Sequence, residues 1–143
     1  MSTYESLSHA KWDCKDHIAF VPQGRKKELY GKVRKFLGPG LHALASPRRS
    51  QILAGHMVQD HVHMLMRIPP KYSVAEVVGY LKGKAAIAVA RQCGGRKRNF
   101  NDETFWARGY AVSTVGCEEE QIRRYIRNQE QLDTQGEDED GEF

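Results

Sequence analysis

Long apolar runs are missing from this sequence, and none approaches the roughly 18 residues that a membrane-spanning helix needs. Residues 1–9 also lack the apolar stretch of a secretory signal peptide, so we expect a cytoplasmic protein with no membrane partner. Cysteine is scarce, because Cys14, Cys93 and Cys117 are widely spaced and form no CxxC pair. This pattern indicates neither a disulfide framework nor a thiolate zinc cluster.

Positive charge is what the chain has in excess. Its 143 residues, enough for one domain, carry a net charge of +4. Residues 134–143 hold five acids and no base, so residues 1–133 carry +9 by themselves. A body that basic favours a polyanionic partner, of which nucleic acid is the usual one. We expect a single domain over 1–133 and a disordered acidic tail over 134–143, more simply a solubilising end than a regulatory one.

Hydrophobic periodicity predicts elements in the order β-α-β-β-α-β-α. The expected strands span 17–21, 51–58, 61–68 and 109–115, and the expected helices begin at 28, at 73 and after 116. Residues 38–40, Gly-Pro-Gly, are expected to interrupt the first helix before a further helical piece over 41–45, and residues 1–15 are expected to be irregular. The order predicts an α+β fold of ferredoxin-like plan, an antiparallel sheet with helices on one face, plus an added C-terminal helix.

Two histidines stand two residues apart in the third expected strand, as His61-Val62-His63. Strand side chains alternate, so both imidazoles leave the same face and could form half of a metal site. The alternative is a pair of half-buried histidines that only form hydrogen bonds. Asp60 would either orient a ligand imidazole or cap the turn, and His56 would be a bystander or an outer partner.

The last expected helix carries a second polar pair on an otherwise apolar face. Ile122, Tyr125, Ile126 and Gln129 follow the i, i+3, i+4, i+7 spacing of one helix face. The simpler interpretation is a core tyrosine with its hydroxyl at the rim. A phenol has a pKa of about 10 and needs help from a divalent ion to attack at neutral pH. Combined with the basic body and the histidine pair, the pattern favours phosphoryl transfer on nucleic acid.

Four co-linear motifs give the sequence a more specific character. They are His61–His63, Tyr80–Lys84, Phe105–Tyr110 leading into Val112–Gly116, and Tyr125–Gln129. In this order they resemble the HUH single-tyrosine transposases, the small TnpA enzymes of the IS200 class of insertion sequences. The resemblance covers the chain from Lys11 to Gln131, and the acidic tail lies outside the family core.

The resemblance implies that His61, His63 and Gln129 bind a magnesium or manganese ion and that Tyr125 is the nucleophile. Tyr125 would attack single-stranded DNA, giving a 5′-phosphotyrosine and a 3′-hydroxyl, and a second 3′-hydroxyl would reverse the step as DNA transposition requires. The family also implies recognition of DNA hairpins at the element ends. It further implies a homodimer in which the tyrosine helix of one subunit faces the histidine pair of the other.

The expected DNA contacts come from two sources. Lys82 and Lys84 match basic positions of the family, whereas Arg48, Arg49, Arg96, Lys97 and Arg98 are suggested by charge alone and are otherwise solvated loop charges. Phe105 and Trp106 would stack on bases or pack in the core. Two other functions remain open: a domesticated relative that processes repeat hairpins, and a dimer that binds nucleic-acid hairpins without catalysis.

Overall fold

A computed structural model describes most of the chain: residues 5–7, 10–25, 29, 31–92, 105–116, 119–133 and 141–143. Side chains are described in these ranges except at 5–7, 10, 25 and 129–133. Within this part of the chain no helix is long and apolar enough to cross a bilayer.

An antiparallel sheet of four strands organises the molecule. Its order is β4-β5-β3-β6, formed by β3 (Lys15–Phe20), β4 (Gln51–Val58), β5 (His61–Arg67) and β6 (Ala111–Val115). The helices are α1 (Gly31–Ala45), α2 (Val74–Gln92) and α4 (Glu119–Asp133), with short 3-10 turns η1 (Gln23–Arg25) and η2 (Ser46–Arg48). A hairpin of β1 (Glu5–Leu7) and β2 (Ala10–Trp12) stands apart from the sheet. The ferredoxin-like α+β prediction is confirmed.

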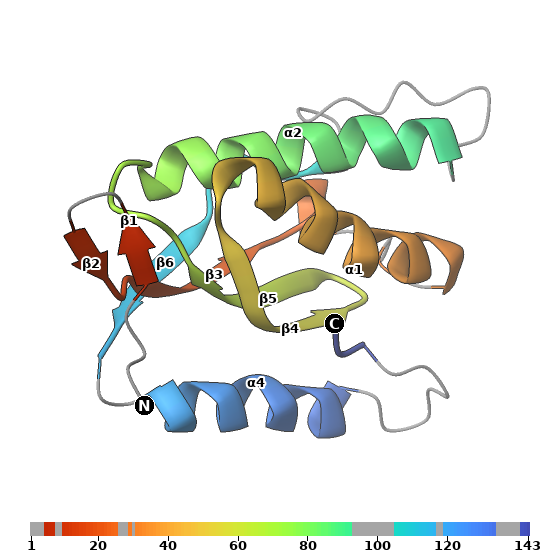
Figure 1. Cartoon of the computed structure of the whole chain (residues 1–143). Helices are drawn as coiled ribbons and strands as arrows, with labels where there is room; N and C mark the ends of the chain where they lie inside the picture. Colours follow the sequence, from red (N-terminus) through yellow and green to blue (C-terminus); the bar gives the residue numbers. More distant parts are fainter. Residues whose placement is uncertain are drawn as a thin grey trace.

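The helices cover both faces of the sheet, α1 and α2 on one and α4 on the other (Figure 1). Strand alternation explains the two cores that result. Val62, Met64 and Met66 of β5 belong to the main core under α1 and α2. Leu65, between them in sequence, belongs to a smaller core with Val115 and Ile126 beneath α4. Strand β5 is therefore buried on both faces. Its histidine side chains consequently lie where access of solvent is restricted.

Local signals set most boundaries as expected. The hairpin of β4 and β5 turns at residues 59–60, and the Oγ of Ser73 accepts a 3.0 Å hydrogen bond from the backbone N–H of Glu76 at the start of α2. Two expectations were wrong. Residues 5–7 and 10–12 form a hairpin, although residues 1–15 were expected to be irregular. Helix α1 also continues through Gly-Pro-Gly, with Pro39 inside it.

The continuity of α1 follows from which side of the helix carries the proline. Pro39 is exposed, and so is Lys35, whose carbonyl loses its helical donor because proline has no N–H. The opposite side carries Leu37 and Leu41, both fully buried in the main core. Burial of these two leucines stabilises the helix on either side of the interruption, at about 1.5–3 kcal/mol for each side chain.

The last residues of the sequence also differ from expectation. The acidic tail was expected to be disordered, but residues 141–143 lie against the outer edge of β4, where Glu142 pairs with His56 in antiparallel fashion. Residues 134–140 lie outside the described residues. The sheet thus gains a short edge segment beyond β4, next to the strand that carries His56.

Candidate active site

The two histidines of β5 leave the same face of the sheet, the face that α4 covers. Their ring centroids lie 4.4 Å apart with the planes at 88°. The Oδ1 of Asp60 lies 2.7 Å from the Nδ1 of His61. An ionised carboxylate can only accept a hydrogen bond, so Nδ1 carries the proton that it donates and the free lone pair of His61 resides on Nε2. The turn residue therefore sets the tautomer of the first histidine.

His63 lies deeper and in a drier environment. It is 8% exposed, and neither ring nitrogen has a hydrogen-bond partner among the described residues. Burial lowers the pKa of His63 to about 3, assisted by the positive charges that His61, His17 and His56 would carry. The imidazole is consequently neutral at physiological pH. A buried polar atom without a partner is costly, and a ligand at this ring would remove the cost.

Two further histidines surround His63, and only one of them had been considered from the sequence. His17 of β3 stacks on His63 with centroids 5.7 Å apart and planes at 5°, and burial lowers its pKa. His56 of β4 is fully buried and stands directly opposite His63 in the β4–β5 register. His17 was missed because its position relative to His63 depends on strand register, which sequence spacing does not reveal.

Tyr125 approaches this cluster from α4. Its ring stands edge-on to His63 at a centroid distance of 6.1 Å and to His17 at 6.2 Å, and 48% of the residue is exposed. The neighbouring Ile126 is buried against Leu65 and fixes the helix on the sheet. The tyrosine therefore reaches the histidines of its own chain, so sharing between subunits is not required to bring them together. The side chain of Gln129, the third expected ligand, lies outside the described residues.

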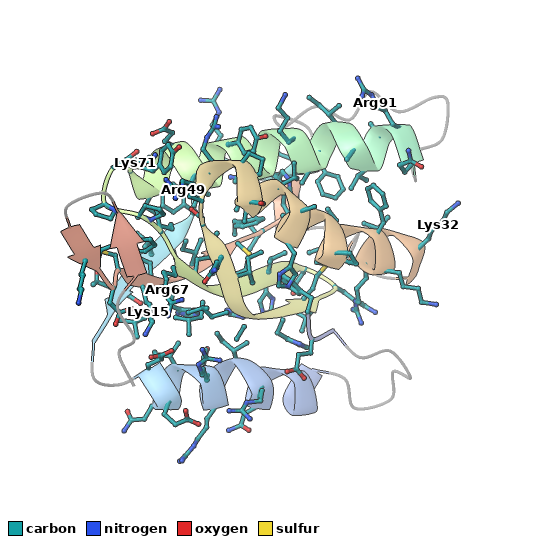
Figure 2. The ribbon with its side chains drawn as sticks, in the orientation of Figure 1. Lys15, Lys32, Arg49, Arg67, Lys71 and Arg91 are labelled. Carbon is teal, nitrogen blue, oxygen red and sulfur yellow. The ribbon has the colours of Figure 1, made fainter. Side chains whose placement is uncertain are left out.

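An ion-pair cluster fixes the start of α4. The buried ammonium of Lys15 lies 2.9 Å from the carboxylate of Glu119 and 3.1 Å from that of Asp13. The hydrogen bond from Lys15 lowers the pKa of Glu119, and Arg123 contributes in the same direction. Burial alone would lower the pKa of Lys15, but the hydrogen bonds to Glu119 and Asp13 raise it above its ordinary value. Figure 2 shows Lys15 near the beginning of α4.

The resemblance implies a metal ion held by His61, His63 and Gln129, and two of these side chains are described. Within the described ranges no group of three or more histidine, cysteine or acidic side chains could by itself hold a metal ion. Two imidazoles, that of His61 oriented by Asp60 and that of His63 with no hydrogen-bond partner among the described residues, fit an ion whose other positions are taken by oxygen donors and substrate. These two residues fit a catalytic site better than a closed structural one.

Lys82, which was expected to contact DNA, makes its described contacts within the chain itself. The residue is 9% exposed, and its ammonium donates 2.8 Å hydrogen bonds to the carbonyls of Ala107 and Gly109. A lysine used in this way holds the segment that leads into β6. Phe105 and Trp106 are both 1% exposed, so they pack in the core and do not offer their faces to bases.

A second group of basic residues does lie at the surface, where η2 meets α2. The guanidinium of Arg48 stacks on the ring of Tyr80 at 4.2 Å, and the ammonium of Lys84 approaches the same ring at 6.0 Å. Arg49 is exposed next to them, in a left-handed backbone conformation with φ of 51°. We call these four residues the η2–α2 basic cluster. The remaining candidates, Arg96, Lys97 and Arg98, lie outside the described residues.

Comparison with known proteins points in one direction. The family described as IS200-like transposases matches residues 10–129. The transposase for insertion sequence element IS200 from Salmonella typhimurium strain LT2 is 41% identical over 137 residues, which cover 96% of this chain and 90% of that protein. The Salmonella typhi transposase for the same element gives the same values.

Solved structures agree on the fold. A crystal structure from Deinococcus radiodurans R1, described as that of a transposase candidate, superposes with a TM-score of 0.70 at 24% identity. The match covers 87% of this chain and 97% of that one. A REP-associated tyrosine transposase bound to a REP hairpin gives a TM-score of 0.58 at 11% identity, over 85% of this chain and 68% of that one.

Proposed function

This chain belongs to the family of IS200-like transposases, and we propose that it cuts and rejoins single-stranded DNA with Tyr125 as the nucleophile. The observation that carries the proposal is the approach of Tyr125 to His63, at a ring distance of 6.1 Å on the face where His61 also emerges. A tyrosine needed only for packing would be covered, whereas 48% of this one is exposed beside the buried, neutral imidazole of His63.

The proposed reaction is a transesterification. The phenolate oxygen of Tyr125 forms a bond to the phosphorus, the bond from phosphorus to the 3′-oxygen breaks, and that oxygen takes up a proton. The protein retains the 5′-end of the DNA as a phosphotyrosine ester on Tyr125. One phosphodiester is exchanged for another, so the 3′-hydroxyl of a second strand can reverse the step without an energy source. Strand transfer follows from this symmetry.

The histidines would bind and orient. His61, held through Nδ1 by Asp60, would present Nε2, and His63 would present a nitrogen that has no hydrogen-bond partner in the described residues. A magnesium or manganese ion bound there would draw charge from the scissile phosphate and lower the pKa of the attacking phenol. Gln129 would add an oxygen ligand one helical turn from Tyr125. The stacked ring of His17 keeps His63 in position.

We propose a DNA hairpin as the substrate, since the REP-associated structural neighbour is bound to one. The η2–α2 basic cluster supports this, because it combines three cationic side chains with the ring of Tyr80. Cations neutralise phosphates regardless of sequence, and an arginine on an aromatic ring is already ordered for contact. Arg96, Lys97 and Arg98, outside the described residues, remain candidates from their charge alone.

We also propose a homodimer formed through β6. This strand ends the order β4-β5-β3-β6, so within the described residues its outer edge is unpaired. Val112 is 45% exposed and the adjacent Tyr110 is 38% exposed, both apolar for a solvent-facing edge. An unpaired apolar edge favours strand pairing with a second copy. Sedimentation should give a dimer, which Val112→Lys should convert to a monomer; a wild-type monomer would contradict the proposal.

The test of catalysis is a cleavage assay on labelled single-stranded hairpin DNA with magnesium or manganese. We expect a covalent protein–DNA adduct that is lost in Tyr125→Phe and retained in the matched control Tyr72→Phe, a tyrosine that packs on the main core. His61→Ala should abolish the adduct while hairpin binding persists. Tight hairpin binding with no adduct at either metal would instead establish a non-catalytic binding protein. Cleavage of genomic repeat hairpins alone would favour the domesticated alternative.

A further inference from the structure

The segment 141–143 is bound to the sheet as an added strand. The N–H of Met57 donates a 2.8 Å hydrogen bond to the carbonyl of Gly141, and the N–H of Phe143 donates one of 2.8 Å to the carbonyl of Gly55. These are the reciprocal bonds of an antiparallel pair around His56 and Glu142. The outer edge of β4, which would otherwise present unpaired backbone groups, is covered at this point.

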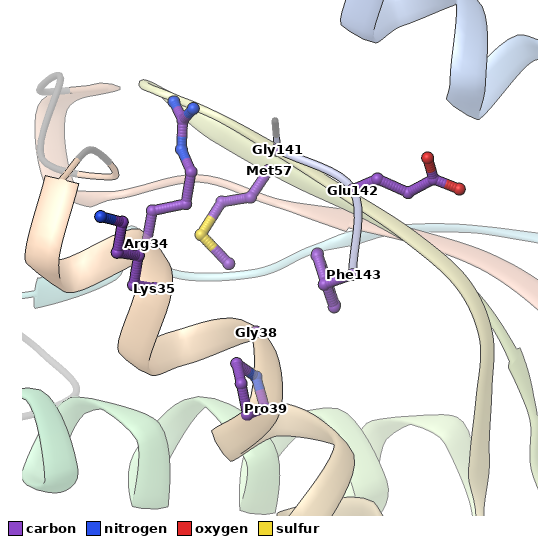
Figure 3. Close-up of a pocket in the computed structure, with 8 residues that line it drawn as sticks. All are labelled: Arg34, Lys35, Gly38, Pro39, Met57, Gly141, Glu142 and Phe143. Carbon is purple, nitrogen blue, oxygen red and sulfur yellow. The ribbon is translucent and has the colours of Figure 1, made fainter. Parts of the chain in front are cut away.

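The side chain of Phe143 anchors the added strand. It packs against the main core, and the His42 ring of α1 meets it edge-on at a centroid distance of 6.0 Å. Figure 3 shows Phe143 turned toward α1, and Glu142 turned the other way, as alternation along a strand requires. A pocket formed by α1, β4 and the segment itself surrounds this anchor; it is lined by Arg34, Lys35, Gly38, Pro39, Met57 and residues 141–143.

Glycines allow this close contact both on the surface that binds the segment and in the segment itself. A Cβ atom at residue 55 would lie 2.6 Å from two ring carbons of Phe143, a distance that no real side chain tolerates. A Cβ at residue 38 would lie 3.0 Å from the Cβ of Phe143. In the segment, a Cβ at residue 141 would collide with the carbonyl oxygen of Met57. The surface is thus shaped for an extended peptide with glycine at one position and an aromatic residue two positions later.

The docked segment also bears on the position of α4. That helix ends at Asp133, and seven residues of sequence separate it from Gly141. Its apolar attachment to the sheet is small, centred on Leu65, Val115 and Ile126. The Lys15–Glu119 ion pair holds the beginning of the helix, and the docked strand returns the chain to the same sheet beyond its end. The chain is therefore attached to this sheet at the beginning of α4 and again at residues 141–143.

We propose that the outer edge of β4, with the hollow at Gly38 and Gly55, is a peptide-binding site of the strand-addition type whose ligand is the chain's own segment 141–143. Its occupancy keeps α4, and hence Tyr125, over the histidines of the same chain. The proposed hold on α4 matters for catalysis only if Tyr125 is the nucleophile, and in that respect it rests on the proposed function. Docking itself is independent of catalysis, and the experiments below measure no cleavage.

Hydrogen exchange on the full chain tests the docking. We expect the amides of Met57 and Phe143 to be protected in the unmodified protein, and to exchange roughly tenfold faster or more in Phe143→Ala. Gly55→Ala should have the same effect by filling the hollow. Gly40→Ala is the matched control, because it lies on α1 near Gly38 but a Cβ there meets nothing within 4 Å. Unprotected amides in the unmodified chain, or equal protection in all variants, would overturn the proposal.

A double variant separates a blocked site from a general loss of stability. If Gly55→Ala acts by excluding the Phe143 ring, adding it to Phe143→Ala should change the exchange of the Met57 amide no further. Fully additive effects would show that residue 55 acts on the fold and not on docking. If Gly55→Ala does not fold, Gly38→Ala compared with Gly40→Ala replaces it, since only the Gly38 position contacts the segment.

Spin labels test whether docking holds the helix. Labels at two exposed positions, Ala75 on α2 and Arg124 on α4, report a distance across the sheet, and dilution with unlabelled protein restricts the signal to single chains. We expect one narrow distance distribution in the otherwise unmodified chain, and a broadened or second population in Phe143→Ala. An unchanged distribution in Phe143→Ala would overturn the proposed hold on α4. This measurement remains valid even if Tyr125 proves not to be the nucleophile.

Discussion

The carboxylate of Asp60 lies 2.7 Å from the Nδ1 of His61, at the turn that joins β4 to β5. The two residues are adjacent in sequence, so the turn itself brings the carboxylate to the ring. This contact directs the other ring nitrogen toward the face that α4 covers. A short stretch of chain thus supplies both a candidate ligand and the group that orients it.

Asp60→Ala should weaken manganese binding. Loss of a carboxylate that orients a ligand histidine typically reduces metal affinity by roughly 10–100-fold. Calorimetric titration of the protein with manganese in the absence of DNA measures this directly. The melting temperature serves as the control, since a half-buried turn residue outside both cores should change it little. Unchanged affinity would assign Asp60 to the turn alone.

Hairpin affinity should fall steeply as salt increases, because binding neutralises several phosphates. Lys84→Ala and Arg49→Ala should each lower the slope of log affinity against log salt by about one. Lys32→Ala makes the same charge change far from this cluster on α1 and should leave the slope unchanged (Figure 2). A flat salt response in the unmodified protein would remove the argument from basic charge.

Lys82→Met should destabilise the fold and affect DNA binding only through stability. The substitution leaves two carbonyls, those of Ala107 and Gly109, without their donor, at about 1–3 kcal/mol for each group that stays dry. Urea unfolding should therefore show a loss of about 2–4 kcal/mol. Lys84→Met, two residues away and exposed, should stay within about 0.5 kcal/mol of the unmodified protein. A loss of hairpin affinity without loss of stability would restore Lys82 as a phosphate contact.

The attachment of α4 should weaken in acid. The pKa of Glu119 is lower in the folded chain than its ordinary value of 4.5, chiefly through the Lys15 hydrogen bond. Stabilisation by this carboxylate is therefore fully present above pH 4.5 and is lost as the pH falls through the lower folded value. Melting temperatures of the intact protein and of Glu119→Gln should differ near neutral pH and converge in strong acid. A difference that does not vary with pH would show that charge at Glu119 is irrelevant.

Features that depend only on neighbours along the chain could be predicted from the sequence. Alternation placed His61 and His63 on one face, and helical spacing placed Tyr125 beside the buried Ile126. The capping box at Ser73 follows from contacts within one turn. Each of these features needs only local geometry.

Features that depend on tertiary contacts could not be predicted from the sequence. The stack of His17 on His63 requires the β3–β5 register. The inward turn of Lys82 depends on carbonyls 25 and 27 residues away. Helix α1 survives its proline because buried leucines flank it. The acidic composition of residues 134–143 predicted disorder. The residues whose contacts dock the segment, Gly141 and Phe143, are outnumbered by acidic ones, so composition alone did not indicate the contact.

The two cores beneath and above the sheet differ greatly in extent. The larger one, under α1 and α2, secures the scaffold, whereas the helix that carries Tyr125, the proposed nucleophile, is attached through the smaller one. A substitution that weakens the packing of Ile126 should reduce catalytic activity while lowering the melting temperature little. Inactive variants of this kind should therefore appear stable in thermal unfolding assays. For this architecture, retention of the native fold is a poor proxy for retention of function.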